Sequence, residues 1–97
     1  MRVFNYATLR DFFERHADAK DPLLAWFDET TNANWQTPLD IKGRFSSADF
    51  VEGNRVIFNI KGNKYRLVVA VRYEFHAVYV RFIGTHAEYD KVNAATV

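Results

Sequence analysis

The stretch RVIFNIKGNKYRLVVAV, residues 55–71, decides the fold. Apolar and polar side chains alternate on both sides of Gly62-Asn63, and this period of two predicts two antiparallel strands joined by a tight hairpin. A glycine at the first central position favours a type II′ turn. The resulting register places Asn59 opposite Arg66, on a face that carries cations, while the other face is apolar.

A third strand is expected at about residues 77–83. If Tyr73 lies opposite His76, three large side chains join the apolar face: Val78, Val80 and Phe82. A slip by one residue would bury Arg81 instead, so burial selects this register. A four-residue loop between the second and third strands is equally acceptable, because it leaves the same side chains on each face of the sheet.

The N-terminal part of the chain has a helical period. Met1–Phe4 reads as a short strand or an extended lead-in, and Asn5 is the expected N-cap of a helix over about residues 6–17. Four apolar side chains recur there at helical spacing: Leu9, Phe12, Phe13 and Ala17. The segment therefore predicts an amphipathic first helix.

A second helix follows closely. Asp21 and Pro22 read as its N-cap and first residue, and it should end near Thr30. Residues 34–54 read as a connection with room for one helical turn. No repeat, low-complexity run or linker divides the chain, so residues 1–97 should form a single domain.

The last motif is GTHAEYDK, residues 84–91. Thr85 and Glu88 fit a capping box, which predicts a short C-terminal helix. Three polar side chains would share one side of this helix: His86, Tyr89 and Asp90. A histidine can donate or accept a proton near neutral pH. Two other readings stay open, namely half of a metal site formed by His86 with Asp90, and an ordinary surface helix.

Cations gather on the solvent face of the predicted sheet, where strand parity brings four of them together: Lys61, Lys64, Arg66 and Arg81. Residues 53–84 contain six Lys and Arg against one acidic residue, Glu74, although the whole chain has a net charge of only +1. Like charges side by side destabilise a sheet, and phosphate oxygens are a natural counter-ligand for them. The alternative is a solvated sheet surface with no ligand.

Composition excludes several classes of protein. The chain has 97 residues, 48% hydrophobic and 26% charged, which is globular composition. Because it has no cysteine, a disulfide framework and a thiolate zinc site are excluded. No run approaches the length of a membrane span, and no apolar segment follows the first residues. We expect a soluble cytoplasmic domain without a cofactor.

The stretches of residues 54–69 and 81–91 together resemble the HigB family of type II toxins, within the RelE/ParE superfamily. The segments FFERH (residues 12–16), DPLLAW (21–26) and FSSAD (45–49) are similar to the same family. The resemblance covers about residues 9–91. It implies an α+β fold with two N-terminal helices packed on an antiparallel sheet and a short C-terminal helix.

The resemblance also implies a function. HigB toxins are mRNA interferases that generally act on translating ribosomes, and a helix-turn-helix antitoxin, HigA, neutralises them. The RelE-like reaction needs no metal: the 2′-hydroxyl of the RNA attacks the adjacent phosphate, giving a 2′,3′-cyclic phosphate and a 5′-hydroxyl.

That chemistry needs proton transfer and cations on the phosphate. On the face described above, the expected catalytic residues are Arg66 for the scissile phosphate, His86 for proton transfer and Tyr89 for stacking on a base or assisting the proton. Three cations are expected to bind RNA phosphate: Lys61, Lys64 and Arg81. Asn59 and Asp90 are possible supporting residues.

Two readings from other classes remain. One is a RelE/ParE relative that does not cleave RNA, either a protein that binds RNA or the ribosome or a toxin with another target. The other is an interaction protein whose basic face serves only an antitoxin. A titratable group beside the cations favours the nuclease, because binding alone does not need one.

Overall fold

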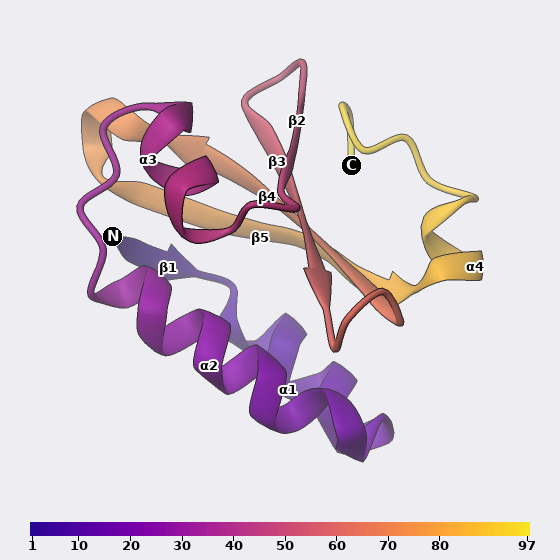
Figure 1. Cartoon of the computed structure of the whole chain (residues 1–97). Helices are drawn as coiled ribbons and strands as arrows, with labels where there is room; N and C mark the ends of the chain where they lie inside the picture. Colours follow the sequence, from indigo (N-terminus) through magenta and orange to yellow (C-terminus); the bar gives the residue numbers. More distant parts are fainter.

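The computed structural model describes all residues, 1–97, and contains one five-stranded sheet in the order β1-β5-β4-β3-β2 (Figure 1). Its strands are β1 (Arg2–Phe4), β2 (Asp49–Val51), β3 (Arg55–Ile60), β4 (Tyr65–Arg72) and β5 (Ala77–Thr85). The helices are α1 (Tyr6–Arg15), α2 (Lys20–Thr31), α3 (Pro38–Arg44) and α4 (His86–Tyr89), with 3₁₀ turns at Ala17–Ala19 and Tyr73–Phe75. The predicted α+β class is confirmed. No helix is long and apolar enough to cross a membrane.

The sheet is mixed, whereas a purely antiparallel sheet was predicted. Strand β1 pairs with β5 in parallel, and the other neighbours are antiparallel. The direction of β1 is fixed at its start, where the ammonium group of Met1 donates to the carbonyl oxygens of Thr30 (3.1 Å) and Ala33 (2.6 Å) at the end of α2. Burial lowers the pKa of this ammonium group.

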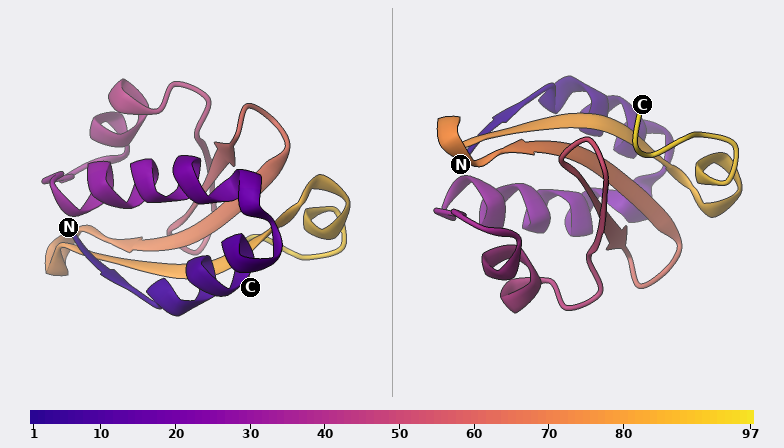
Figure 2. Two further views of the ribbon diagram at one scale, coloured as in Figure 1. Left: turned by 90° about the horizontal axis from the view of Figure 1, so that it is seen from below. Right: turned by 90° about the horizontal axis from the view of Figure 1, so that it is seen from above.

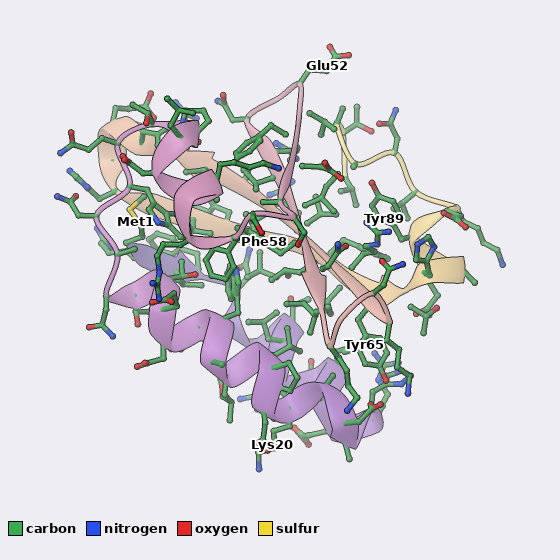
Figure 3. All side chains as sticks on the ribbon, in the orientation of Figure 1. Met1, Lys20, Glu52, Phe58, Tyr65 and Tyr89 are labelled. Atoms are coloured by element: carbon green, nitrogen blue, oxygen red, sulfur yellow. The ribbon has the colours of Figure 1, made fainter.

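Helices α1 and α2 cover one face of the sheet, and the core lies between the two layers (Figures 1 and 2). Phe58 of β3 is at the centre of an aromatic cluster, with its ring centroid 5.5 Å from Trp26 and 5.0 Å from Phe45. Figure 3 shows Phe58 between the sheet and α2. Helix α3 adds the fully buried Ile41 to the same core.

The two N-terminal helices form where the apolar spacing predicted them, but their starts differ. Asn5 has a left-handed backbone (φ 71°), and its side chain makes no capping hydrogen bond; its amide instead donates to the carbonyl of Val80 (3.2 Å). Helix α2 begins at Lys20, so Asp21 lies in its first turn and is not the N-cap. A 3₁₀ turn at Ala17–Ala19 already brings the chain into the helix.

The connection before the hairpin holds more structure than predicted. Helix α3 has seven residues, capped by Thr37 and Asp40, whose carboxylate accepts from the backbone of Thr37 (3.2 Å). Strand β2 pairs with the start of β3. One helical turn was expected here, and α3 is longer than that. Strand β2 was not predicted, because three residues are too few to show an alternating pattern.

The hairpin has the predicted register. Asn59 pairs with Arg66 and Ile60 with Tyr65, and Lys64 N donates to Lys61 O (3.2 Å) to close the turn. Gly62 has a positive φ of 63°, as its turn position requires, and Lys61 also adopts φ 53°. Strands β3 and β4 thus present the faces that the sequence predicted.

A β-bulge changes the second half of β5. Val71 pairs with Val78 and Val69 with Val80, as predicted, but Val68 pairs with Phe82, so Arg81 is the extra residue. Placing Phe82 on the apolar face was therefore wrong. Ile83 takes that place and belongs to the core cluster, and Phe82 faces the other side. The bulge lets β5 bury Ile83 without burying Arg81.

Candidate functional site

Arg66 and His86 are in direct contact at the end of the sheet. Nη2 of Arg66 lies 2.7 Å from Nε2 of His86. A guanidinium group has no acceptor, so a hydrogen bond at this contact requires Nε2 to accept it. A cation therefore lies beside a ring nitrogen, and an unprotonated ring nitrogen can take a proton from a substrate.

Tyr89 and Asp90 complete this group. The Arg66 guanidinium lies over the Tyr89 ring, 5.6 Å from its centroid, which is a cation–π distance. Asp90 is 3.8 Å from Nδ1 of His86, which is too far for a hydrogen bond. The structure thus brings together the three expected catalytic residues and Asp90; we call Arg66, His86 and Tyr89 the Arg66 site.

Two buried polar atoms on paired residues of the hairpin have no hydrogen-bond partner. Nε of Arg66 and Oδ1 of Asn59 are covered but form no hydrogen bond, and the two residues are paired in the ladder. A buried polar atom without a partner costs about 1–3 kcal/mol. Such atoms are uncommon in folded proteins. The other two in this chain, Nε1 of Trp26 and Oγ1 of Thr30, lie in α2, so Arg66 and Asn59 carry the two that lie in the hairpin.

The short helix α4 holds His86 and Tyr89 in place. Thr85 and Glu88 form the predicted capping box: Glu88 N donates to Thr85 Oγ1 (3.2 Å), and Thr85 N donates to Glu88 Oε1 (2.8 Å). The backbone hydrogen bond from Thr85 lowers the pKa of Glu88. Gly84 precedes the helix and lies opposite Arg66. A Cβ atom on Gly84 would lie 2.6 Å from Cζ of Phe82, so a larger residue would displace its surroundings.

The two hairpin lysines are arranged differently from each other. Lys61 is exposed and forms no ion pair. Nζ of Lys64 lies 2.5 Å from the carboxylate of Asp18, which also accepts the hydroxyl hydrogen bond of Tyr65. Figure 3 shows Tyr65 on the helix side of the strands and Tyr89 on the opposite side. Lys64 is therefore drawn toward the helices rather than joined to Arg66.

The contact with Lys64 holds the pKa of Asp18 below its usual range, with the Tyr65 hydroxyl adding to the effect. In return Asp18 raises the pKa values of Lys64 and Tyr65. This network ties the turn before α2 to the hairpin. No pattern in the sequence indicates this network, because Asp18 and Lys64 are 46 residues apart.

Arg81 belongs to a second group of cations. Its Nε donates to the carbonyl oxygen of Val97 (3.1 Å), and Arg55 donates to the same oxygen from Nε (3.2 Å) and Nη2 (2.8 Å). Arg55, Arg72 and Arg81 line one pocket. The expected convergence of Arg81 with Arg66 is thus replaced by a separate cluster. Arg72 was not among the expected site residues. It is an even number of positions from Arg66 on β4, so strand parity already places it on the same face.

The reading of His86 and Asp90 as two ligands of a metal finds no third ligand. No group of three or more His, Cys, Asp or Glu side chains in the chain is arranged to hold a metal ion. His16 is half-buried and stacks on Phe12 with centroids 4.3 Å apart, so it packs with the core side of α1.

The chain is similar to known proteins over most of its length. A family model described as HigB_toxin, the RelE-like toxic component of a toxin–antitoxin system, matches residues 19–92. The chain is 29% identical over 92 residues to a protein of Escherichia coli K12 named "mRNA interferase toxin HigB", covering 93% of this chain and 88% of that relative. Proteins of Escherichia coli O157:H7 and Shigella flexneri named "mRNA interferase HigB" match to the same extent. The resemblance found in the sequence is confirmed, and the chain belongs to the HigB family of RelE-like toxins, whose members are partnered by an antitoxin.

Proposed function

We propose that this chain is an mRNA interferase, an endoribonuclease that cleaves translated mRNA on the ribosome. Membership of the toxin family and the names of its relatives support this activity. The observation that carries the proposal is the 2.7 Å contact between Arg66 and His86. It puts a permanent cation and a group that can transfer a proton at one point, as phosphoryl transfer from RNA requires.

In the proposed reaction the 2′-hydroxyl of one nucleotide attacks the adjacent phosphorus. The bond from O2′ to phosphorus forms and the bond from phosphorus to O5′ breaks, which gives a 2′,3′-cyclic phosphate and a 5′-hydroxyl. His86 accepts the 2′ proton at Nε2, and the departing O5′ takes up a proton from Tyr89 or from water. The proposed chemistry uses no metal, because the positive charge comes from Arg66.

Arg66 is suited to the phosphorane because it has five N–H donors in a planar fork. Its Nε has no partner within the chain, and its Nη2 bond to His86 can be exchanged for one to a phosphate oxygen. Binding of the phosphate would therefore free Nε2 of His86 at the moment when it must accept a proton. Tyr89 either stacks on a base or supplies the second proton.

The other expected residues take supporting roles in the proposal. Lys61 is free to meet a flanking phosphate, whereas Lys64 adds positive potential while paired with Asp18. Asn59 can bind a sugar or phosphate oxygen through its amide, and Asp90 stabilises His86 after the ring has gained a proton. We further propose that the antitoxin is a helix-turn-helix protein of the HigA kind.

The test is to map the ends of mRNA fragments in a bacterial translation extract. Wild type should produce cuts with 5′-hydroxyl and 2′,3′-cyclic phosphate ends, and only on messages that are being translated. His86→Ala should abolish the cuts, while its thermal unfolding midpoint and its binding to the antitoxin stay as in wild type.

Three other outcomes would contradict parts of the proposal. Cleavage by His86→Ala at the wild-type rate would remove His86 from proton transfer. Cuts on untranslated RNA would show that cleavage does not depend on the ribosome. No cuts by either protein would favour a family member that binds RNA, the ribosome or an antitoxin without cleaving.

A further inference from the structure

The face of the sheet opposite α1 and α2 has a second concentration of positive charge. Arg55 of β3, Arg72 of β4 and Arg81 of β5 line a pocket of about 330 Å³, together with the side chains of Tyr79 and Phe75. No aspartate or glutamate side chain lines this pocket. Arg72 also forms an ion pair with Glu74, at 3.2 Å. Three guanidinium groups so placed repel one another unless an electronegative ligand lies between them.

The chain itself supplies one oxygen atom to these arginines. The carbonyl oxygen of Val97 accepts three hydrogen bonds, two from Arg55 and one from Arg81. The segment after α4 reaches this point along the side of the sheet away from α1 and α2 (Figures 1 and 2). One oxygen held by two arginines is the arrangement in which arginine pairs bind a phosphate oxygen.

The pocket lies on the same sheet face as the Arg66 site. Arg66 and Arg72 are both on β4 and have the same parity. Six residues of strand separate them, which is about 20 Å at roughly 3.3 Å per residue. A single RNA strand with its scissile phosphate at Arg66 would pass over the pocket after a few nucleotides.

We propose that Arg55, Arg72 and Arg81 form a second phosphate-binding site for the RNA strand, separate from the Arg66 site. The inference rests on the proposed function, since it extends the path of the same RNA. The ligand is a phosphodiester, held by arginine forks, with a neighbouring base against Tyr79 or the exposed ring of Phe75. The carbonyl oxygen of Val97 lies where a phosphate oxygen will bind, so RNA must displace the C-terminal segment.

RNA fits this pocket better than an acidic peptide. Arginine forks match either phosphate or carboxylate, but two aromatic side chains beside them provide stacking surfaces that a peptide of Asp and Glu does not use. Arg72 also lies over the Phe75 ring, 5.4 Å from its centroid, which keeps the two side chains together. The pairing of cation and ring is typical of single-strand binding.

The experiment measures binding of a fluorescein-labelled, 2′-O-methylated oligouridylate of about 15 nucleotides, by anisotropy at several salt concentrations. The methyl groups block 2′-hydroxyl attack, so binding is measured without cleavage. Arg72→Gln and Arg81→Gln should each weaken binding about 3–10-fold at low salt and reduce the slope of log K against log salt by about 0.7. Arg10→Gln, an exposed arginine of α1 on the far side of the sheet, should bind as wild type.

Arg72→Gln is the decisive variant because Arg72 does not contact Val97, so its loss leaves the C-terminal segment in place. In addition, the amide signal of Val97 in an NMR spectrum should shift when the oligouridylate binds. Thermal unfolding midpoints of the variants within a few degrees of wild type would show that they fold.

Wild-type affinity and salt slope in both variants would overturn the second site. So would displacement of the oligouridylate by polyglutamate at the same concentration of charge, which would indicate an acidic protein partner. The proposed nuclease fails separately: weaker binding by the variants with no mRNA cleavage by wild type would retain the second site and remove the enzyme. Cleavage by wild type with unchanged binding by the variants would retain the enzyme and remove the second site.

Discussion

Arg66 and His86 lie 2.7 Å apart through Nη2 and Nε2, although 20 residues separate them in the chain. The β-bulge at Arg81 makes this contact possible. Without the extra residue, the register of Val69 with Val80 would continue and Ile83 would lie opposite Arg66. The bulge shifts the register by one, so Gly84 lies opposite Arg66 and α4 begins directly beside the guanidinium group. A local irregularity of the strand thus aligns the Arg66 site.

The first prediction concerns the shape of the Arg66 side chain. Arg66→Ala should lower the rate of mRNA cleavage about 100–1,000-fold, as expected for loss of a group that stabilises charge in a transition state. Arg66→Lys should recover only part of this loss, because lysine keeps the charge but lacks the fork. Rates would be measured by primer extension in a translation extract, with Arg10→Ala as the control. Equal activity of Arg66→Lys and wild type would reduce Arg66 to a source of general positive potential.

The second prediction concerns the space at Gly84. Gly84→Ala places a Cβ atom 2.6 Å from Cζ of Phe82 and 3.1 Å from Cβ of Glu88. Overpacking of this kind lowers the free energy of unfolding by about 1–3 kcal/mol. Because it also displaces α4, which carries His86 and Tyr89, the variant should cleave mRNA more slowly. Phe82→Leu removes Cζ, so the double variant should regain part of the stability and of the activity. Urea unfolding and the cleavage assay would be measured for all four proteins, and strictly additive effects would show that the Phe82 contact is not the cause.

Patterns of period two and 3.6 predicted most of the fold. The hairpin register followed from Gly62 and the alternation around it, and the short C-terminal helix followed from Thr85 and Glu88, because each of these signals is local. The bulge at Arg81 could not be predicted: burying either Phe82 or Ile83 satisfies the apolar pattern equally well. The parallel pairing of β1 was also hidden, since it depends on contacts between Met1 and the distant end of α2.

The candidate site likewise has a part that local sequence patterns predicted and a part that they did not. His86 and Tyr89 were placed correctly relative to each other because one helix carries both. The link between Asp18 and Lys64 depends on how the helix layer meets the hairpin, and no sequence period reports it. Arg81 was expected beside Arg66 because the bulge could not be predicted, and the structure places it with Arg55.

The third prediction concerns the aromatic core. Phe58 is 2% exposed and its ring packs against Trp26, Trp35 and Phe45. Phe58→Ala should lower the free energy of unfolding by about 3–5 kcal/mol, through lost burial and the cavity that remains. Phe75→Ala removes an equal side chain that is 62% exposed, and it should change the free energy by about 0.5 kcal/mol or less. Urea unfolding followed by tryptophan fluorescence measures both. Comparable losses in the two variants would contradict the placement of the core around Phe58.

The fourth prediction concerns pH and the carboxylate of Asp18. Its hydrogen bond with Lys64 lowers the pKa of Asp18 in the folded chain below the usual 3.8. The folded state therefore binds this proton less readily than the unfolded chain does, so the contribution to stability is fully present above about pH 4. It is lost as the pH falls through the lowered pKa of the folded state.

The alkaline side has the opposite sign. Asp18 raises the pKa values of Tyr65 and Lys64 above 10.0 and 10.5, so their stabilisation is present below about pH 10 and is lost as the pH rises through the raised values. Asp18→Asn should thus be less stable than wild type at neutral pH, and the difference should shrink at both extremes. Urea unfolding at a series of pH values measures the difference, with Glu14→Gln, an exposed carboxylate of α1, as the control. A gap between wild type and Asp18→Asn that stays constant from acid to alkaline pH would show that the carboxylate acts by packing and not by its charge.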